Sequence, residues 1–449
     1  MSVSNYAFDA PNDLSVGAVR RLMDDVFRPQ YQQNVKLRKL IKEMGKPVDE
    51  VNVRGREFGV QLSRGSRTTG RPSMGYLPKP LPTSEARGSY TYAKLQKGIS
   101  FDWETLRHME LSSAIVKLSD RLAQHQEKFE ADASYFSYGD GSGALAVVTT
   151  VAGTGPYTLT VTATTDTYGG AGSNGTARLN IVEEVDIVSA SAVEATVQIA
   201  SIASATTFTC TVVSGTLTAG ALTAIVVPSG SRPAGFNGAS YMPHGVAYNC
   251  PTASSTDWWG INPSSAGNIE CRSTVVDLSS ASFTVGYANW LEDAVRHRRP
   301  MEKDDALTSK TKILIGVGQA RSIKQSMNSI RRAGMGDKTF VLGAQNVANQ
   351  WGNIWEEDPG CPDSRCYNLW MGSWQLPTLQ ELEYVDEGEG MWHLRPANTT
   401  SASGFYIQAY DGWTQEVMEI VNTEAFKQAA IVGIGVSTIQ TAASLAHQF

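Results

Sequence analysis

The strongest pattern in this chain is Trp103-Glu-Thr-Leu-Arg-His-Met-Glu-Leu-Ser-Ser-Ala-Ile-Val-Lys-Leu-Ser-Asp-Arg-Leu-Ala-Gln-His-Gln-Glu-Lys-Phe129, followed by Tyr138-Gly-Asp-Gly-Ser-Gly143. Its apolar side chains recur at steps of four and three, which places them on one face of a helix. They are Leu111, Ile115, Leu118, Leu122, His125 and Phe129. Such a helix would be roughly 40 Å long at about 1.5 Å per residue. The glycines after it supply the positive φ angles that end a helix and turn the chain.

Length and charge bound the class of protein. A chain of 449 residues is expected to form two or three hydrophobic cores. Its formal charge of -6 argues against tight wrapping of nucleic acid, because that affinity comes from Lys and Arg on phosphates. The first ten residues lack the basic and apolar runs of an export signal, so we expect none. The apolar stretch 429–436 is too short to span a membrane.

Before the helix, the chain is unusually basic. We predict a helix from Val16 to Phe27 that Pro29 stops, then a basic run at 36–39, together forming an arm that packs on something else. Segment 51–98 holds nine Lys or Arg and two Glu, an excess of seven positive charges. Strand-like ends at 57–62 and 89–94 enclose a centre rich in Gly and Pro. A long two-stranded loop is predicted, which needs a partner surface to be stable. A solvated basic loop is the alternative.

After the helix, the composition changes to a block rich in Thr, Ala and Val. Arg178 is the only Lys or Arg between Ala144 and Ser231. Five short β-branched runs predict strands in a small antiparallel barrel or sandwich that is inserted as an independent unit. These runs are 157–162, 185–188, 195–202, 208–213 and 221–227.

The remainder mixes strands and helices. We predict a helix at 287–298 and a buried strand that runs through Gly316-Val-Gly318 into another helix. Strands are further predicted at 340–343, 367–370, 405–410 and 415–421.

Motifs for chemistry are weak throughout. Gly316-Val-Gly318 has the start of a dinucleotide-binding turn, but Arg321 stands where the third glycine belongs. Cys361 and Cys366 could form half of a zinc site, and no second Cys/His pair at ligand spacing accompanies them. The odd number of five cysteines favours reduced thiols. His125 lies on the apolar stripe and is interpreted as structural. We therefore predict no catalytic, cofactor-binding or metal site, and no enzyme.

The order of these segments resembles the major capsid proteins of tailed phages with the Hong Kong 97 shell fold. The resemblance rests on the arm, the basic loop and the long helix closing in Tyr138-Gly-Asp-Gly-Ser-Gly-Ala-Leu-Ala146. It also rests on 232–237 followed by Asp257-Trp-Trp-Gly-Ile-Asn262, and on Asp358-Pro-Gly-Cys-Pro362 running into Tyr367-Asn-Leu-Trp370.

The resemblance implies an α+β, Hong Kong 97-like capsid fold with a small all-β insertion domain. Its parts would be an N-terminal arm (1–50), an extended loop (51–100), a peripheral domain with a spine helix (101–143), an inserted β-barrel or sandwich (144–231), an axial domain (232–384), and closing strands with the C-terminus (385–449). Members with a cleaved scaffolding segment begin with a long helical extension that this sequence lacks, so a scaffold would be a separate protein or absent.

The function that the resemblance implies is a major capsid protein in a virion. Copies would assemble in the host cytoplasm into hexamers and pentamers of an icosahedral shell around double-stranded DNA, contacted without sequence specificity. Scaffolding, portal and decoration proteins are further expected partners, and no membrane or cofactor is expected. We predict that Arg64, Arg67, Arg71 and Lys79 contact carboxylates of a neighbouring copy.

Three alternatives stay open. Some family members join a loop lysine to an asparagine of a neighbour, and Lys79 with Asn398 is the only placement that the sequence allows, although solvated side chains are the favoured interpretation. A phage tail or receptor-binding protein would also carry inserted β domains, but it should show fibre repeats, and none is found. An α/β enzyme should show clustered titratable residues in Gly-rich turns, whereas these turns carry mainly Ser, Thr and Ala.

Overall fold

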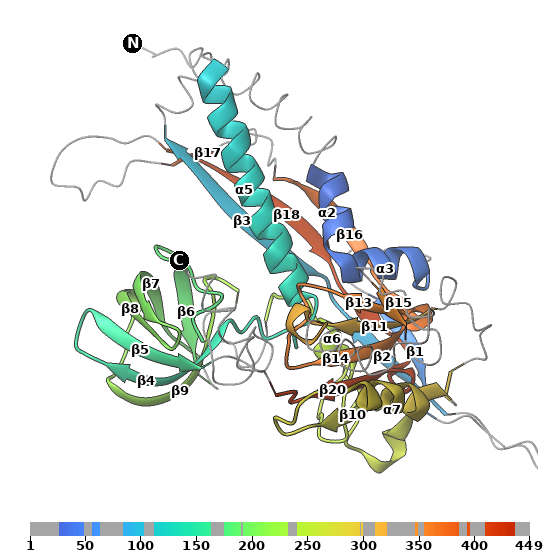
Figure 1. Ribbon diagram of the computed structural model, residues 1–449. Coiled ribbons are helices and arrows are strands. Elements are labelled where there is room, and N and C mark those ends of the chain that lie inside the picture. Colours follow the sequence, from blue (N-terminus) through green and yellow to red (C-terminus); the bar gives the residue numbers. More distant parts are fainter. Residues whose placement is uncertain are drawn as a thin grey trace, which may run out of the picture.

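The computed structural model describes residues 27–48, 56–62, 84–102, 112–162, 175–189, 192–231, 240–296, 298–299, 310–320, 346–348, 354–385, 393–395 and 409–435. These residues form an elongated sheet with a long helix lying along it. A second sheet lies at one end of the elongated sheet, and a barrel lies beside them (Figure 1).

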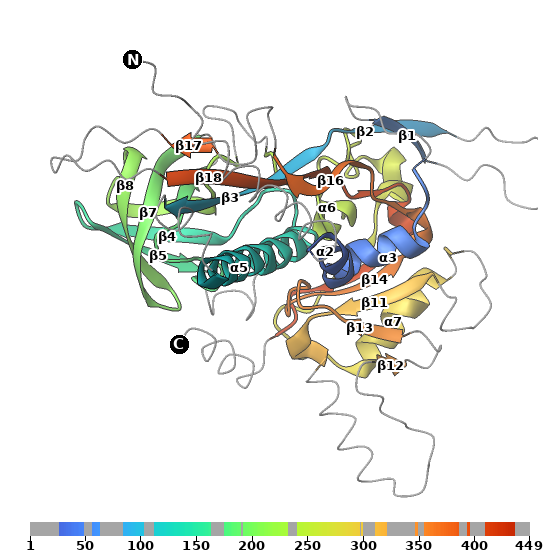
Figure 2. The same cartoon turned by 90° about the horizontal axis from the view of Figure 1, so that it is seen from above.

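The long helix is α5 (Ser112–Phe136), and it lies along the elongated sheet (Figures 1 and 2). Residues 103–111 of the predicted helix lie outside the described residues. The helix does not end at Phe129, as predicted, but continues to Phe136, because Ala133 and Phe136 extend the buried face that Leu122 and Phe129 begin.

Two long antiparallel strands form the centre of the elongated sheet. β3 (Ala93–Asp102) pairs with β18 (Ala409–Met418) over the full length of both strands. β16 (Thr378–Tyr384) and β17 (His393–Arg395) pair with successive parts of the other edge of β18. Strand β16 falls within the range 232–384 predicted as the axial domain, and it pairs in this sheet, whereas β10 to β14 pair in the second one.

The second sheet has six strands in mixed orientation. Their order is β10 (Thr274–Asp277), β20 (Ala429–Val432), β14 (Cys366–Trp370), β11 (Thr311–Ile315), β13 (Ile354–Glu357) and β12 (Asn346–Ala348). Helix α7 (Val285–Arg296) covers one face, where Leu291 and Val295 are fully buried in the same cluster as Ile313 and Trp355. Every residue of β11 and β14 is buried, as expected for central strands.

Residues 146–228 form a closed barrel of six strands, which decides between the barrel and the sandwich that the sequence leaves open. Around the barrel the strands are β4 (Ala146–Ala152), β5 (Tyr157–Thr162), β8 (Thr207–Gly215), β7 (Val193–Ser204), β6 (Glu184–Val188) and β9 (Gly220–Pro228). The sequence analysis missed β4. The interior is filled by alternating side chains that have no exposed surface, among them Val148, Leu159, Ile187, Val197 and Phe208.

Two short helices pack where the sheets meet. α2 (Arg28–Asn34) and α3 (Lys36–Met44) bury Tyr31, Leu37, Arg38, Leu40 and Ile41 in the main core of the same chain. The prediction that Pro29 stops helical structure is wrong, because Pro29 lies in the first turn of α2, where its missing N–H leaves no bond unmade. The predicted helix 16–26 lies outside the described residues.

Shorter elements complete the connections between the sheets. They are α6 (Val246–Asn249), η3 (Ala266–Cys271), η4 (Met371–Ser373), η5 (Ala425–Lys427), and the strand pair β15 (Trp374–Gln375) and β19 (Val421–Asn422).

Candidate assembly interface

The basic loop begins as a regular hairpin that stands at the margin of the molecule (Figure 2). β1 (Arg56–Gln61) pairs antiparallel with β2 (Glu85–Tyr90), from Arg56 opposite Tyr90 to Gln61 opposite Glu85. The predicted single strand 89–94 is instead divided between two strands, because Thr91 and Tyr92 belong to no strand and separate β2 from β3. The predicted contact residues Arg64, Arg67, Arg71 and Lys79 lie outside the described residues, as does Asn398.

The described part of the hairpin carries exposed charges of both signs. Arg87 and Glu57 face each other across the two strands, with 3.5 Å between Nη1 and Oε2. Both side chains are mostly exposed, so this pair contributes little to stability. These side chains are available for contacts with another molecule.

The hairpin is attached to the body through an aromatic cluster. Phe58 and Tyr90 pack against Trp258 and Trp259, with ring centroids 6.2 to 6.4 Å apart. Three of these four side chains are almost completely buried, and Phe58 is half-buried. Burial of aromatic rings contributes more to such an attachment than any surface ion pair. We call these four residues, with Tyr248 and His244 beside them, the hairpin root.

A strained turn forms the body side of the root. Trp258 and Ile261 exchange two backbone hydrogen bonds, and between them Trp259 and Gly260 have φ angles of +55° and +83°. Two positive φ angles are typical of a type I′ turn, which favours Asn-Gly, so a Trp there is strained. Its conformation is held by its indole N–H on Asn249 (3.0 Å) and its backbone N–H on the Tyr248 hydroxyl (2.8 Å). The pattern around Trp258 and Trp259 predicts no contact with the loop, because nothing local to these residues signals a partner so far away in the chain.

A buried ion pair fixes the body behind the root. Arg38 of α3 lies 2.5 Å from Glu416 of β18 and also donates to Ser137 at the end of α5. Tyr31 of α2 hydrogen-bonds to both Arg38 and Glu416. Burial opposes ionisation of the guanidinium, but the adjacent Glu416 raises the pKa of Arg38 overall. Four elements are thereby locked in one relative position.

The candidate chemical motifs have structural explanations. The N–H of Gly318 donates to Asp363 Oδ1 at 2.8 Å, so this glycine turn is occupied by a carboxylate of its own chain instead of a phosphate. His125 is buried, its Nε2 lies 3.0 Å from Thr414 Oγ1, and burial together with Lys97 and Lys128 lowers its pKa to about 3. It is a neutral structural histidine.

The five cysteines are all free and buried. Burial raises the pKa of Cys210 and Cys271 to about 11, which keeps both as unreactive thiols at neutral pH. Among the described residues, no group of His, Cys, Asp and Glu is arranged to hold a metal ion.

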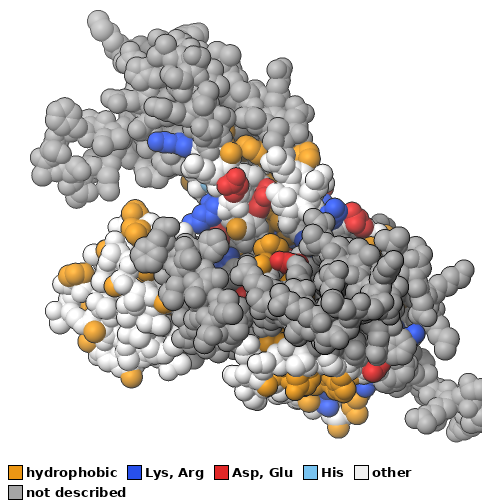
Figure 3. All heavy atoms as spheres, in the orientation of Figure 1, with side chains coloured by type: hydrophobic (Ala, Val, Ile, Leu, Met, Phe, Trp, Pro, Cys, Tyr) orange, Lys and Arg blue, Asp and Glu red, His pale blue; other side chains and the backbone are white. Residues whose placement is uncertain are grey.

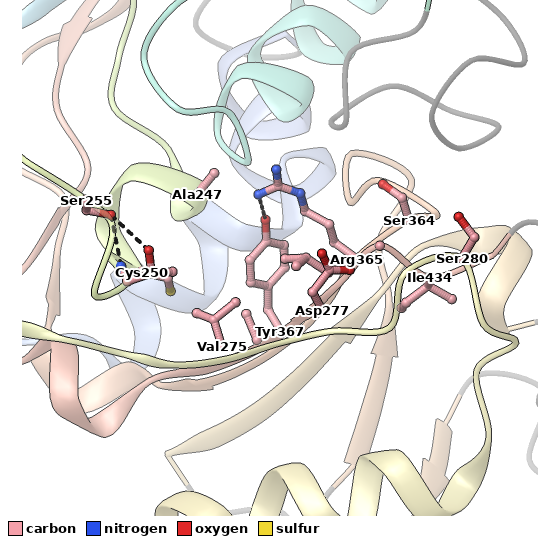
Figure 4. Close-up of a pocket in the computed structure, with 14 residues that line it drawn as sticks. Ala247, Cys250, Ser255, Val275, Asp277, Ser280, Ser364, Arg365, Tyr367 and Ile434 are labelled. Carbon is pink, nitrogen blue, oxygen red and sulfur yellow. Dashed lines mark hydrogen bonds between the residues drawn. The ribbon is translucent and has the colours of Figure 1, made fainter.

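A hollow of about 340 Å³ lies beside the six-stranded sheet (Figure 4). Arg365 and Tyr367 stand on one wall, with 3.1 Å between the guanidinium and the phenol oxygen. Asp277 ends β10 and Ser280 lies in the loop after it, and Val275 and Ile434 add apolar surface. Its lining comes from residues 247–280, 364–367 and 430–434, which fits a joint between segments of the chain better than a catalytic pocket.

The barrel surface differs from the rest of the molecule. On the face shown in Figure 3, the hydrophobic side chains of the barrel are scattered singly among uncharged atoms. The described Lys, Arg, Asp and Glu side chains on this face lie outside the barrel. Arg178, the one cation of the barrel block, stacks on Tyr135 of α5 with 4.2 Å from its guanidinium carbon to the ring centroid. The barrel is thus tied to the end of the long helix by a cation–π contact.

No helix within the described ranges has the length and apolarity needed to cross a lipid bilayer.

Comparison with known proteins gives matches among solved structures only. No protein-family model matches the chain, and no curated protein matches its sequence. The chain is similar to the capsid asymmetric unit of cyanophage A-1(L), with 12% identity, coverage of 88% of this chain and 92% of that one, and a TM-score of 0.46.

Two further matches are also phage-like particles. The capsid of a native GTA particle is 10% identical, with coverage of 90% and 91% and a TM-score of 0.41. The capsid asymmetric unit of cyanophage Pam1 is 10% identical, with coverage of 88% and 92% and a TM-score of 0.39. All three solved structures are described as capsids. At TM-scores below 0.5, the function of this chain has to be argued from its own residues.

Proposed function

We propose that this chain is a major capsid protein whose copies form an icosahedral shell. The observation that carries the proposal is the β1–β2 hairpin at the margin of the molecule, whose described residues are attached to the body through the aromatic root. A two-stranded hairpin does not bury enough surface to be stable in water by itself. Its outer part therefore needs a surface on another molecule.

The composition of the loop indicates the kind of partner. Between Leu62 and Ser84 the chain has four Lys or Arg and no Asp or Glu, whereas the whole chain has a net charge of -6. A second copy of the same chain therefore offers a surface of opposite net charge. A contact between two different faces of identical copies is heterologous, and repetition of it closes a ring when the rotation allows. Hexamers and pentamers are the rings that an icosahedral shell requires.

The rigid body behind the hairpin suits this role. The buried Arg38–Glu416 pair and the long β3–β18 ladder fix the direction in which the hairpin leaves the body. Each copy would be held by several neighbours at once, so contacts of modest strength suffice. Packaged double-stranded DNA, a scaffold, a portal and decoration proteins would be the remaining partners, in a virion assembled in the host cytoplasm.

The test is the triple variant Arg64→Ala, Arg67→Ala, Arg71→Ala. We expect a folded protein that no longer forms closed particles, capsomer rings or tubes in light scattering and negative-stain microscopy. The matched control is Lys39→Ala, Lys42→Ala, Lys46→Ala, which removes three exposed cations from α3 and its C-terminal end and should leave assembly intact.

Two outcomes would decide against the proposal. Wild-type protein that stays monomeric with its phage partners present would return the tail-protein and enzyme interpretations. Unchanged assembly of the triple variant would remove the loop from the role proposed for it. The Lys79–Asn398 cross-link has its own test, because denaturing electrophoresis of mature particles shows only monomer bands if no covalent bond forms.

A further inference from the structure

A histidine and a buried carboxylate lie together inside the hairpin root. His244 Nδ1 is 3.3 Å from Glu419 Oε2, and the Glu419 side chain is only 1% exposed. Glu419 Oε1 accepts the backbone N–H groups of His244 (2.8 Å) and Ile420 (3.0 Å). Within the described residues, Glu419 has no Lys or Arg within ion-pair distance. His244 is therefore the side chain that can neutralise this buried charge.

The histidine is in contact with water, as a proton-exchanging group must be. Its side chain is 31% exposed, and it lies at a hollow of about 480 Å³ that both the hairpin and the body line. The ring packs closely against Gly141, where the Cβ of any other residue would lie 2.7 Å from His244 Cδ2. The turn after α5 thus holds the imidazole against Glu419.

The imidazole also touches the strained turn of the root. Its ring centroid lies 4.3 Å from that of Tyr248 and 4.9 Å from that of Trp259. The Trp259 carbonyl accepts the backbone N–H of Ser89 in β2 at 3.0 Å, and its ring packs on Tyr90 and Phe58. A continuous chain of contacts therefore runs from Glu419 through His244 and Trp259 to both strands of the hairpin.

We propose that His244 and Glu419 form a proton-operated latch that sets how firmly the β1–β2 hairpin is held to the body. With a neutral ring, Nδ1–H donates a hydrogen bond to the carboxylate, and only the acceptor carries a charge. A proton taken from water by Nε2 makes the donor positive as well, so the bond becomes an ion pair and the ring becomes a cation between two aromatic faces. The turn that carries the hairpin is then held more tightly.

The other charged groups nearby set the limits of this latch. Arg56, Glu57 and Asp257 line the same hollow, with the phenols of Tyr90 and Tyr248. Arg38 acts on Glu419 from a longer distance. Burial raises the pKa of Glu419, an effect that its bonds from His244 and the backbone partly offset. The carboxylate is therefore protonated earlier on acidification than an exposed one, and the latch should weaken again once Glu419 takes up its own proton.

This inference rests on the proposed function, since the grip on the hairpin matters only if the hairpin reaches a neighbour. The test is hydrogen exchange on the full-length, unassembled protein at pH 8.0 and 5.5, expressed as protection factors corrected for the intrinsic rates. Histidine changes charge in this range. We expect β1 and β2 amides to be about fivefold better protected at pH 5.5, because an ion pair with hydrogen bonding holds more strongly than a hydrogen bond from a neutral ring to the same carboxylate.

Three variants separate the latch from general effects of pH. His244→Gln and Glu419→Gln keep a side-chain amide in place of each partner and should each remove the pH dependence. Glu57→Gln removes an exposed carboxylate from the same hollow, and this variant should keep the pH dependence of hairpin protection. Barrel amides serve as the internal reference for folding. The double variant with Gln at both positions provides an uncharged pair if either single one fails to fold.

Hairpin protection that does not change with pH in the wild type would overturn the proposal, as would the same change in His244→Gln. Shells that form without the pH effect would leave the proposed function standing and the latch refuted. A protein that shows the pH effect but never assembles would support the latch and refute the proposed function.

Discussion

The barrel and the hairpin are both antiparallel β structure, and they solve the problem of open edges in opposite ways. The barrel closes on itself, so every strand has two neighbours and its interior side chains have no exposed surface. The hairpin has two strands and borrows its core from Trp258 and Trp259. A closed unit is independent of its surroundings, whereas an open one depends on them and can therefore respond to a partner.

Excision should give the largest contrast between the two regions. We expect residues 144–231 expressed alone to show a β-sheet circular dichroism spectrum and a cooperative thermal transition. We expect residues 51–100 alone to show neither, because they lack the aromatic body side of the root. A non-cooperative barrel fragment would mean that the barrel also depends on the body.

Truncation of one phenylalanine in each region should differ in cost. Phe208→Ala empties the centre of the barrel and should cost about 3 to 5 kcal/mol of unfolding free energy. Phe58→Ala should cost about 1 to 2 kcal/mol, because this ring is only half-buried. Urea denaturation measures both, with the exposed Thr211→Ala as a control that should stay within about 0.5 kcal/mol. Equal costs would contradict the view that the barrel has a core of its own whereas the hairpin borrows its core from the body.

Two glycines compare the regions at smaller scale. Gly215 of the barrel has φ +83°, and a Cβ there would lie 2.4 Å from the Glu194 carbonyl oxygen, so Gly215→Ala must move backbone and should cost about 1 to 3 kcal/mol. At Gly88 of the hairpin the obstacle is the Phe58 ring, 2.7 Å away. This ring can shift, so Gly88→Ala should cost about 1 kcal/mol or less. Chemical denaturation with exchange of the local amides distinguishes the two.

The smallest effect is expected at the joint between the barrel and the body. Lys97 and Glu183 line a hollow there of about 600 Å³, and burial lowers the pKa of Lys97 to about 8. Below pH 8 this lysine is charged in both the folded and unfolded states, so its burial costs stability. As pH rises from 8 toward the ordinary lysine value, only the folded state loses the proton and stability increases.

Lys97→Met tests this sign. The variant should be more stable than the wild type at pH 7, and the difference should shrink at pH 10. Denaturation curves at the two pH values measure it, and a difference that grows with pH would contradict the assignment. Partial exposure of Lys97 keeps the effect modest.

Local patterns in the sequence were sufficient for the elements whose side chains alternate without interruption. Four of the five runs predicted in the barrel block overlap the observed strands within about two residues at each end, and the fifth, 157–162, coincides with β5. The buried face of α5 was predicted from Leu122, His125 and Phe129, all of which are buried. Periodicity reports which face of an element is buried, and this needs no knowledge of the partner.

Tertiary contacts decided the rest of the fold. Pro29 begins a helix instead of ending one, because the neighbouring apolar residues find a core between α5 and β18. β16 follows β14 and β15 in the sequence but pairs with β18 in the elongated sheet. β20 follows β18 and β19 but pairs with β10 and β14 in the six-stranded sheet. Pairing partners far apart in the chain leave no local signal.

The candidate site shows the same division. The amino-acid sequence by itself determined that segment 51–98 is basic and predicted strands at its two ends, because charge and alternation are properties of adjacent residues. Only the tertiary structure brought Phe58, Trp259, His244 and Glu419 together, from segments up to 361 positions apart (419 − 58). The strain at Trp259 and the burial of Glu419 arise from packing, and packing is a property of the folded chain as a whole.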